Sequence, residues 1–297
     1  MLERPNPSMR LAIGFATRGR AAVLRETLAG LSDQTRVPDR VVVCHTMAED
    51  VAGIEAGPGI EFLRAPAGLP KQRNRILDAV RDCDLLLFLD DDFLMARRYV
   101  EATVAIFANH PDIVATTGTT IADGIKGPGL TPAAGRALIA AEGDPALDLG
   151  FAPAPHGYGC NMAIRIETAR QHAVWFDEKL PLYAWSEDVD YTHRLGRYGA
   201  IAKLRGARGV HLGVKSGRSP GRNLGYSQVA NPIYLRRKGS YSWSRALGSV
   251  GRNLVANCLK AAWPEKYIDR RGRLLGNALA LRDLARGRLS PERVLEL

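Results

Sequence analysis

The segment LLLFLDDD, residues 85–92, sets an uninterrupted apolar run directly before three aspartates. A short apolar run bounded by polar residues is typical of a strand buried in a parallel sheet. Carboxylates at the carboxyl end of such a strand lie where open α/β sheets bind their ligands. Adjacent carboxylates repel one another, so a fold that crowds them commonly holds a cation. The triplet therefore predicts a metal and phosphate site, although alone it is equally typical of a solvated loop or a helix N-terminus.

Strands and helices alternate around this segment. Apolar runs predict strands at residues 11–16, 41–44, 60–63 and 113–118, and helical spacing of apolar residues predicts helices at 21–33, 71–81 and 96–109. This alternation predicts βαβ units and an α/β fold with a mostly parallel central sheet. Residues 123–156 form a long insert rich in Gly, Pro and Ala, with a weak helix near 132–142. Such an insert is typical of a lid or acceptor loop, and equally of disorder.

The bulk composition excludes several protein classes. The 297 residues suffice for one large domain with an extension, and no window approaches the ~18–20 apolar residues that cross a bilayer. Residues 1–10 lack the apolar core of a secretory signal, which predicts a cytoplasmic protein. The four cysteines are widely separated, so neither a zinc site nor a disulfide framework is expected.

Positive charge gathers in the C-terminal third. Residues 203–297 hold 20 Lys and Arg against 5 Asp and Glu, a net +15 that leaves −5 for the rest of the chain. A basic tail on an acidic body predicts an anionic partner: a nucleotide, a lipid pyrophosphate or an acidic membrane surface. Nucleic acid is not expected, because no nucleic-acid-binding motif is present.

A second acidic cluster, EDVD at residues 187–190, follows Ser186. Ser186 is predicted to cap a helix that ends near Tyr198, with Gly199 as its stop. The cluster is typical of a well-capped helix, whereas a carboxylate that faced the site would serve as a general base. His211 follows a short strand-like segment, and such a histidine is either structural or a ligand to a carboxylate-bound cation.

Together these motifs resemble glycosyltransferase family 2, the inverting nucleotide-sugar transferases with the GT-A fold. The resemblance covers roughly residues 10 to 215. It rests on the order and spacing of seven segments: TRGR (17–20), QT (34–35), GLPKQRN (68–74), FLDDD (88–92), GCNM (159–162), FDE (176–178) and EDVD (187–190) with Arg194.

The resemblance implies a role for individual residues and a divalent cation, Mn²⁺ or Mg²⁺, as cofactor. It implies that Asp92 is the principal metal ligand, that His211 completes the coordination and that Asp188 is the catalytic base. It further implies contacts to the nucleotide or substrate from Thr17, Arg18, Arg20, Arg73, Asn74, Asp90, Asp91, Asn161, Trp185 and Glu187. One departure concerns the nucleobase, since the second strand ends in Cys44-His45-Thr46 where the family often has an aspartate. UDP is the family's commonest nucleotide.

The expected organisation is a flexible tail (1–9), a GT-A catalytic domain (10–230) and a basic helical C-terminal extension (231–297). The catalytic domain divides into a nucleotide-sugar-binding half (10–122) and an acceptor-binding half (123–230). In the extension, apolar residues at helical spacing predict a helix at 244–263. This pattern fits an interfacial helix on an anionic leaflet, and equally a helix packed on the catalytic domain with a solvated basic face.

The expected function is metal-dependent, inverting sugar transfer from a nucleotide-diphosphate sugar, with UDP-sugar as the first choice. The acceptor is expected to be a lipid-linked saccharide in surface polysaccharide assembly, at the inner face of the plasma membrane. Two alternatives stay open: a sugar-1-phosphate nucleotidyltransferase and an inactive membrane-associated scaffold of the same fold. A homodimer stays open as well.

Overall fold

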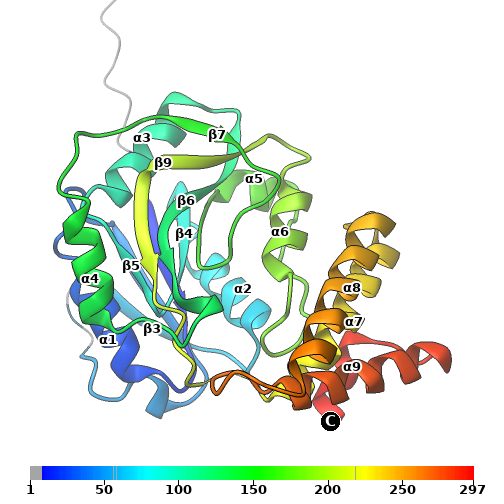
Figure 1. Cartoon of the computed structure of the whole chain (residues 1–297). Helices are drawn as coiled ribbons and strands as arrows, with labels where there is room; N and C mark the ends of the chain where they lie inside the picture. Colours follow the sequence, from blue (N-terminus) through cyan, green and yellow to red (C-terminus); the bar gives the residue numbers. More distant parts are fainter. Residues whose placement is uncertain (1–8, 56, 58, 218) are drawn as a thin grey trace, which may run out of the picture.

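The computed structural model describes residues 9–297 except 56, 58 and 218. Within these residues the chain forms one nine-stranded sheet with helices on both faces, and a group of three helices packs beside it (Figure 1). This arrangement confirms the α/β prediction. The tail expected at residues 1–9 lies, apart from Met9, outside the described residues.

The strands predicted at residues 11–16, 41–44, 60–63, 85–89 and 113–118 are present, whereas the strands at 93–95 and 151–153 were not predicted. The strands are β1 (Leu11–Ala16), β2 (Arg40–His45), β3 (Ile60–Arg64), β4 (Leu85–Asp90), β5 (Phe93–Met95), β6 (Ile113–Asp123), β7 (Phe151–Pro153), β8 (Asn161–Arg165) and β9 (Ala200–His211).

Most of the helices were predicted from the sequence, but those at residues 166–171 and 221–238 were not. The helices are α1 (Ala21–Ala29), α2 (Leu69–Ala79), α3 (Tyr99–Asn109), α4 (Pro132–Ala141), α5 (Ile166–Gln171), α6 (Glu187–Leu195), α7 (Gly221–Lys238), α8 (Trp243–Lys260) and α9 (Arg270–Ala285). Short 3₁₀ turns lie at η1 (Ala48–Val51), η2 (Gly124–Lys126) and η3 (Pro291–Glu296).

The sheet order is β3-β2-β1-β4-β8-β6-β9-β5, with β7 paired to β9. Six strands run in one direction, because β1 to β4 pair in parallel and β6 and β9 keep that direction. β5, β7 and β8 run against them. The carboxyl ends of β1, β4, β6 and β9 therefore meet along one edge of the sheet, where ligands bind in such folds.

Each strand places alternate side chains in one of two cores. Leu85, Leu87 and Leu89 of β4 face the core covered by α1 and α3. Leu86 and Phe88 face the core covered by α2, α5 and α6. A strand that is apolar on both faces must be buried on both, which is why the run before the aspartates carries no alternation.

The C-terminal helices have a small core of their own and are tied to the sheet domain through α6. Tyr226, Val229 and Ile233 of α7 pack against Val250 of α8 and Ala280 of α9. The boundary expected between residues 230 and 231 falls inside α7, because residues 221–238 form one continuous helix that includes a proline.

One buried carboxylate joins α6 to this helical group. Asp190 accepts hydrogen bonds from Lys238 Nζ (2.8 Å), from Arg194 Nε (3.1 Å) and from Ser240 Oγ. Breaking such a buried network leaves charges without partners. The helical group is therefore structurally continuous with the helix that carries Asp188.

In the part of the chain that the structure describes, every helix is too short or too polar to span a lipid bilayer.

Replacing Gly118 by Ala tests the packing beneath the site. A Cβ at Gly118 would lie 2.5 Å from the Ala207 carbonyl oxygen and 2.3 Å from Tyr99 Oη. We expect the free energy of unfolding, measured in urea, to fall by about 1–3 kcal/mol. Gly251→Ala is the matched control: it lies inside α8, and apart from the backbone of its own helix nothing lies within 4 Å of the new Cβ. The control should gain roughly 0.5–1 kcal/mol, and equal effects of the two changes would contradict the packing described here.

Candidate functional site

The three carboxylates at the end of β4 point to different partners. Asp91 accepts hydrogen bonds from Thr17 Oγ1 (2.8 Å) and Arg20 Nη1 (2.9 Å). Asp92 is buried, and its Oδ2 accepts from the Val214 backbone N–H (2.7 Å). Burial raises the pKa of Asp91 to about 6, although Arg20 opposes this rise. The loop after β1 therefore supports the triplet through Thr17 and Arg20.

Asp90, Asp92 and His211 form a group suited to a metal ion. One ligand atom from each lies within 4.8 Å of the others. His211 Nε2 is 3.3 Å from Asp92 Oδ1 and 3.8 Å from Asp90 Oδ2. Asp92 Oδ1 is buried, and its contact with His211 Nε2 does not have the geometry of a hydrogen bond, so a further ligand could be accommodated there. Carboxylate oxygens with one imidazole suit Mn²⁺ or Mg²⁺, so the residues fit the expected cofactor.

Asp123 orients His211 and was missed in the sequence. Its Oδ1 lies 2.9 Å from His211 Nδ1, and its Oδ2 accepts from the Tyr158 hydroxyl (2.9 Å). A carboxylate on the far nitrogen of a ligating histidine fixes the ring and raises its basicity. Burial alone would lower the pKa of His211, but Asp123 and Asp92 raise it to about 10. Metal binding would displace that proton, because a histidine ligand must be deprotonated.

Arg73 is a buried support of the site. It forms a close ion pair with Glu187 Oε1 (2.5 Å), donates to the Gly159 carbonyl (2.6 Å) and lies 3.4 Å from Asp90 Oδ1. Burial raises the pKa of Glu187 to about 8, and Arg73 opposes that rise. The guanidinium also lies 5.5 Å from the ring centres of Phe88 and Phe176. Arg73 and Glu187 therefore join β4 to α6 from beneath the site.

Asp188 lies half-buried on the first turn of α6. Its Oδ2 accepts from the Gly159 N–H (2.8 Å) and its Oδ1 from the Val189 N–H (2.8 Å). The neighbouring Cys160 carbonyl accepts from the Asp90 N–H (3.1 Å). Residues 159–160 thus connect Asp188, Arg73 and Asp90. Such a carboxylate, beside a carboxylate-lined edge, can accept a proton from a bound hydroxyl.

The segment before α6 is strained. Leu182, Ala184 and Ser186 have positive φ angles of 57°, 52° and 72°. A non-glycine residue in this region costs about 1–3 kcal/mol and persists only when its surroundings fix it. The Leu69 N–H donates to the Leu182 carbonyl (2.9 Å), and Asn231 Nδ2 of α7 donates to the Trp185 carbonyl (3.0 Å). The strain and these ties hold the start of α6 in place.

Ser186 directly precedes α6, as predicted, but it does not cap the helix with its side chain, and its backbone is left-handed. The helix ends at Leu195 with Gly196 as its stop, whereas the sequence predicted an end near Tyr198 with Gly199 as the stop. The chain turns earlier because β9 already begins at Ala200. Trp185 is half-buried, and its Nε1 is buried without a hydrogen-bond partner.

Two other predicted residues lie in structural positions. Asn161 is fully buried, and its side chain accepts from Thr117 Oγ1 (2.6 Å) within the sheet. Asn74 holds the segment after α5, because its amide bonds the backbone of Phe176 at 2.8 and 3.0 Å. The structure therefore does not bring either side chain to the metal-binding group.

Arg18 lies apart from the triplet and lines a pocket of about 510 Å³. The pocket lies beyond the ends of β1, β2 and β3, with Thr46 and Arg64 also in its wall. The nearby carboxylate of Asp50 is buried and accepts from the backbone N–H groups of Gly19 and Thr46. Asp50 therefore holds the loop after β1 in place and is not free to recognise a base.

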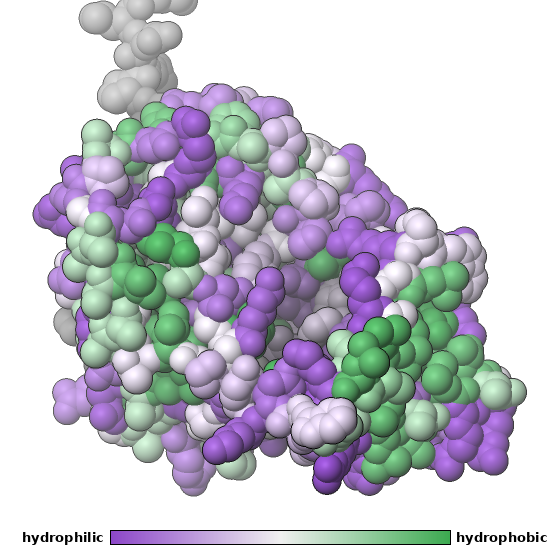
Figure 2. All heavy atoms as spheres, viewed as in Figure 1, coloured by the Kyte–Doolittle hydropathy of each residue, from purple (hydrophilic) through white to green (hydrophobic). Residues whose placement is uncertain are grey.

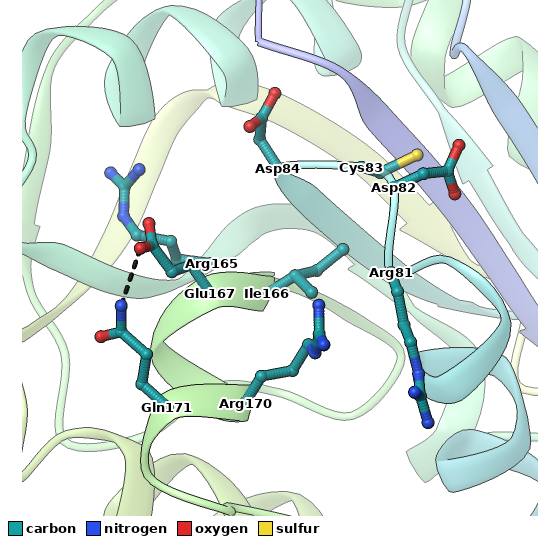
Figure 3. A pocket seen from close by; sticks show the side chains of 9 residues that line it. All are labelled: Arg81, Asp82, Cys83, Asp84, Arg165, Ile166, Glu167, Arg170 and Gln171. Atoms are coloured by element: carbon teal, nitrogen blue, oxygen red, sulfur yellow. Dashed lines mark hydrogen bonds between the residues drawn. The ribbon is translucent and has the colours of Figure 1, made fainter.

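A second pocket, of about 560 Å³, lies at the opposite end of β4 (Figure 3). Residues 81–84, before β4, line it together with Arg165 at the end of β8 and four residues of α5. Glu167 and Gln171 bond each other there (2.7 Å), and Arg165 donates to the Phe107 carbonyl (3.0 Å). It shares no residue with the metal-binding group, so it is not part of this site.

The chain has no match among protein-family models or among curated protein sequences. Its fold is nevertheless similar to that of several solved structures. GalNAc-T7 with UDP, GalNAc and Mn²⁺ matches with a TM-score of 0.55 and 14% identity, over 88% of this chain and 59% of that one. This chain therefore spans less than two thirds of GalNAc-T7.

Two further structures match over most of both chains. A structure of Staphylococcus aureus TarS has a TM-score of 0.54 and 14% identity, over 94% of this chain and 92% of that one. The mannosyltransferase PcManGT from Pyrobaculum calidifontis, in complex with GDP-Man and Mn²⁺, has a TM-score of 0.52 and 14% identity, over 98% and 87%. At these identities the likeness shows the fold alone, which is the GT-A fold.

Removing single carboxylates should locate the cation. We expect wild-type protein to bind Mn²⁺ in calorimetry, and Asp92→Asn to bind it at least about 100-fold more weakly because a ligand is lost. Asp123→Asn should weaken binding by about 10–100-fold, since it only orients His211. Asp112→Asn, an exposed change outside the site, is the control. Unchanged affinity in Asp92→Asn would place the cation elsewhere.

Removing Arg73 should make stability depend on pH. Arg73→Met leaves the Glu187 carboxylate buried without its cation, and we expect a loss of about 3–5 kcal/mol of unfolding free energy near pH 8. The loss should be smaller near pH 5. Glu187 has a raised pKa in the folded protein, so folding favours its protonated form and stability falls as pH rises from about 4.5 toward 8.

The double variant Arg73→Met/Glu187→Gln separates this charge effect from packing. It should lose stability by similar amounts at both pH values, because no titrating carboxyl is left at that position. An Arg73→Met protein with the same loss at pH 5 and pH 8 would contradict the ion pair.

Proposed function

We propose that the protein is a metal-dependent, inverting glycosyltransferase that moves a sugar from a nucleotide-diphosphate sugar to a saccharide hydroxyl. The proposal rests on one observation: a set of residues suited to a metal ion and a separate carboxylate lie at the same edge of a GT-A sheet. One group is the metal-suited set of Asp90, Asp92 and His211. The other is the Asp188 carboxylate, which residues 159–160 connect to Asp90.

The donor is proposed to bind across the carboxyl ends of β1 and β4. Asp92 and His211 would hold the cation, with Asp90 beside them. When bound there, a divalent cation neutralises charge that develops on the diphosphate leaving group. The pocket lined by Arg18 and Arg64 is proposed to take the nucleoside, because it adjoins the loop that supports Asp91.

Asp188 is proposed to act as the general base. It would accept the proton of the acceptor hydroxyl as that oxygen attacks the anomeric carbon from the face opposite the leaving group. A single displacement of this kind inverts the anomeric centre. Glu187 and Arg73 would keep the first turn of α6 aligned with β4, and Trp185 would lie beside the acceptor.

The identities of the donor nucleotide and of the acceptor are also proposed. UDP-sugar is the proposed donor, supported by the fold shared with GalNAc-T7, which was solved with UDP, and with TarS, which was solved with UDP-GlcNAc. PcManGT was solved with GDP-Man, so a guanine nucleotide is the second choice. The acceptor is proposed to be a lipid-linked saccharide at the inner face of the plasma membrane, held by residues 123–230.

The first experiment is calorimetry of UDP, GDP, dTDP, CDP and ADP, with and without Mn²⁺. We expect one nucleotide to bind tightly only when Mn²⁺ is present, because the cation contacts both the carboxylates and the diphosphate. The same nucleotide should fail to bind Asp92→Ala. Absence of binding to every nucleotide by folded protein would overturn the proposal.

The second experiment separates catalysis from binding. Asp188→Asn should lower turnover, or slow donor hydrolysis, by about 10²–10⁴-fold because the base is lost. Its affinity for the donor nucleotide should stay near that of the wild type. Asp112→Asn, an exposed change outside the site, should alter neither quantity. A large loss of donor affinity with unchanged turnover in Asp188→Asn would contradict its role as the base.

A further inference from the structure

α8 carries a ridge of large apolar side chains on its outer face. Trp243, Leu247, Val255 and Leu259 are all more than half exposed, and Trp263 just beyond the helix is 87% exposed. These positions are separated by four residues or by multiples of four, so they lie along one ridge of the helix surface. Figure 2 shows an apolar patch over the region of α8 and α9, bordered by hydrophilic atoms.

The ridge is not needed for packing within the chain. The opposite side of α8 is already packed, with Ala246 against the segment before α6 and Val250 against α7. The sequence left two arrangements open for this helix, packing on the rest of the chain and lying on a membrane surface. The inner face of α8 fits the first arrangement, and the exposed outer face fits the second. A large exposed apolar patch on a folded protein marks an interaction surface.

The charge around the ridge points to an anionic occupant. Residues 243–263 contain three basic residues and no acidic residue, and of the three, Lys260 is paired with Glu265 (2.6 Å). The guanidinium of Arg236, at the end of α7, lies 5.1 Å from the ring centre of Trp243. Tryptophan and arginine together suit the headgroup level of a bilayer, where the ring sits at the apolar boundary and the cation meets phosphate.

A second copy of the chain fits the ridge poorly. Pairing this face with itself would bring Arg245 and Arg252 of two copies together, whereas Lys260 is already paired with Glu265 (2.6 Å). Like charges facing each other oppose association. An apolar ridge with basic residues beside it is instead the pattern of a helix that lies in a membrane surface.

We propose that the outer face of α8, with Trp243 and Trp263 near its ends, docks the protein onto an anionic phospholipid bilayer. The helix would lie along the surface, with Leu247, Val255 and Leu259 entering the acyl boundary. Because α7 holds the segment before α6 through Asn231, this docking would fix the catalytic edge relative to the membrane. That last consequence rests on the proposed function, whereas the docking does not.

The test is flotation of the full chain with phosphatidylcholine vesicles, with and without phosphatidylglycerol. Wild-type protein should bind the anionic vesicles and bind them more weakly at high salt. Val255→Ser/Leu259→Ser should bind at least about tenfold more weakly, because the apolar contact is lost without any change in charge. Trp fluorescence of the wild type should shift to shorter wavelength on binding.

The matched control is Val37→Ser/Leu149→Ser. Val37 is 64% exposed and Val255 is 57% exposed, but Val37 and Leu149 lie in loops of the sheet domain. The control should bind vesicles like the wild type. Thermal unfolding of both variants, and nucleotide binding with Mn²⁺, should match the wild type. Intact vesicle docking without nucleotide binding would leave this proposal standing and overturn only the proposed function.

Three results would overturn the docking. Wild-type protein that ignores anionic vesicles at low salt is the first, and equal binding by Val255→Ser/Leu259→Ser is the second. The third is self-association of the wild type that the double substitution abolishes, because that would assign the ridge to a second copy of the chain.

Discussion

Repulsion among three consecutive carboxylates at the end of a buried strand is the constraint on which the rest of the site depends. At close range in a poorly solvated edge, such charges are costly unless cations or hydrogen-bond donors meet them. Arg20 meets Asp91, and His211 meets Asp92. The Asp92 oxygen that faces His211, Oδ1, is buried and has no hydrogen bond of good geometry. A divalent cation would offset the remaining negative charge of these carboxylates. Metal binding would therefore stabilise the fold of this edge.

The same edge explains why distant segments converge. His211 reaches the triplet because β9 pairs with β6, and Asp123 stands opposite His211 in that pairing. α6 reaches it through the buried Arg73–Glu187 pair, and α6 is fixed from behind by residues of α7. The C-terminal helices are therefore part of the support of the carboxylate-lined edge as well as a candidate membrane surface.

Features that depend on the local sequence pattern were predicted correctly. Features that depend on contacts between segments far apart in the sequence were missed. The apolar run before Asp90 was enough to place β4 and its carboxylates. Asp123 was missed because β6 was expected to end at residue 118, whereas pairing with β9 extends it to 123. The cap at Ser186 was mispredicted because tertiary contacts hold that residue in a left-handed conformation. Asn161 resembles a substrate-binding residue in sequence, yet burial in the sheet becomes visible only when β8 pairs with β6.

The measurement that tests the central claim most directly is an anomalous difference map, recorded near the manganese absorption edge, from crystals grown with Mn²⁺ and the nucleoside diphosphate that binds best. The account predicts one strong peak within coordination distance of Asp92 and His211, with the diphosphate on its open side. A peak at any other carboxylate cluster, or bound nucleotide with no peak at Asp92, would contradict it.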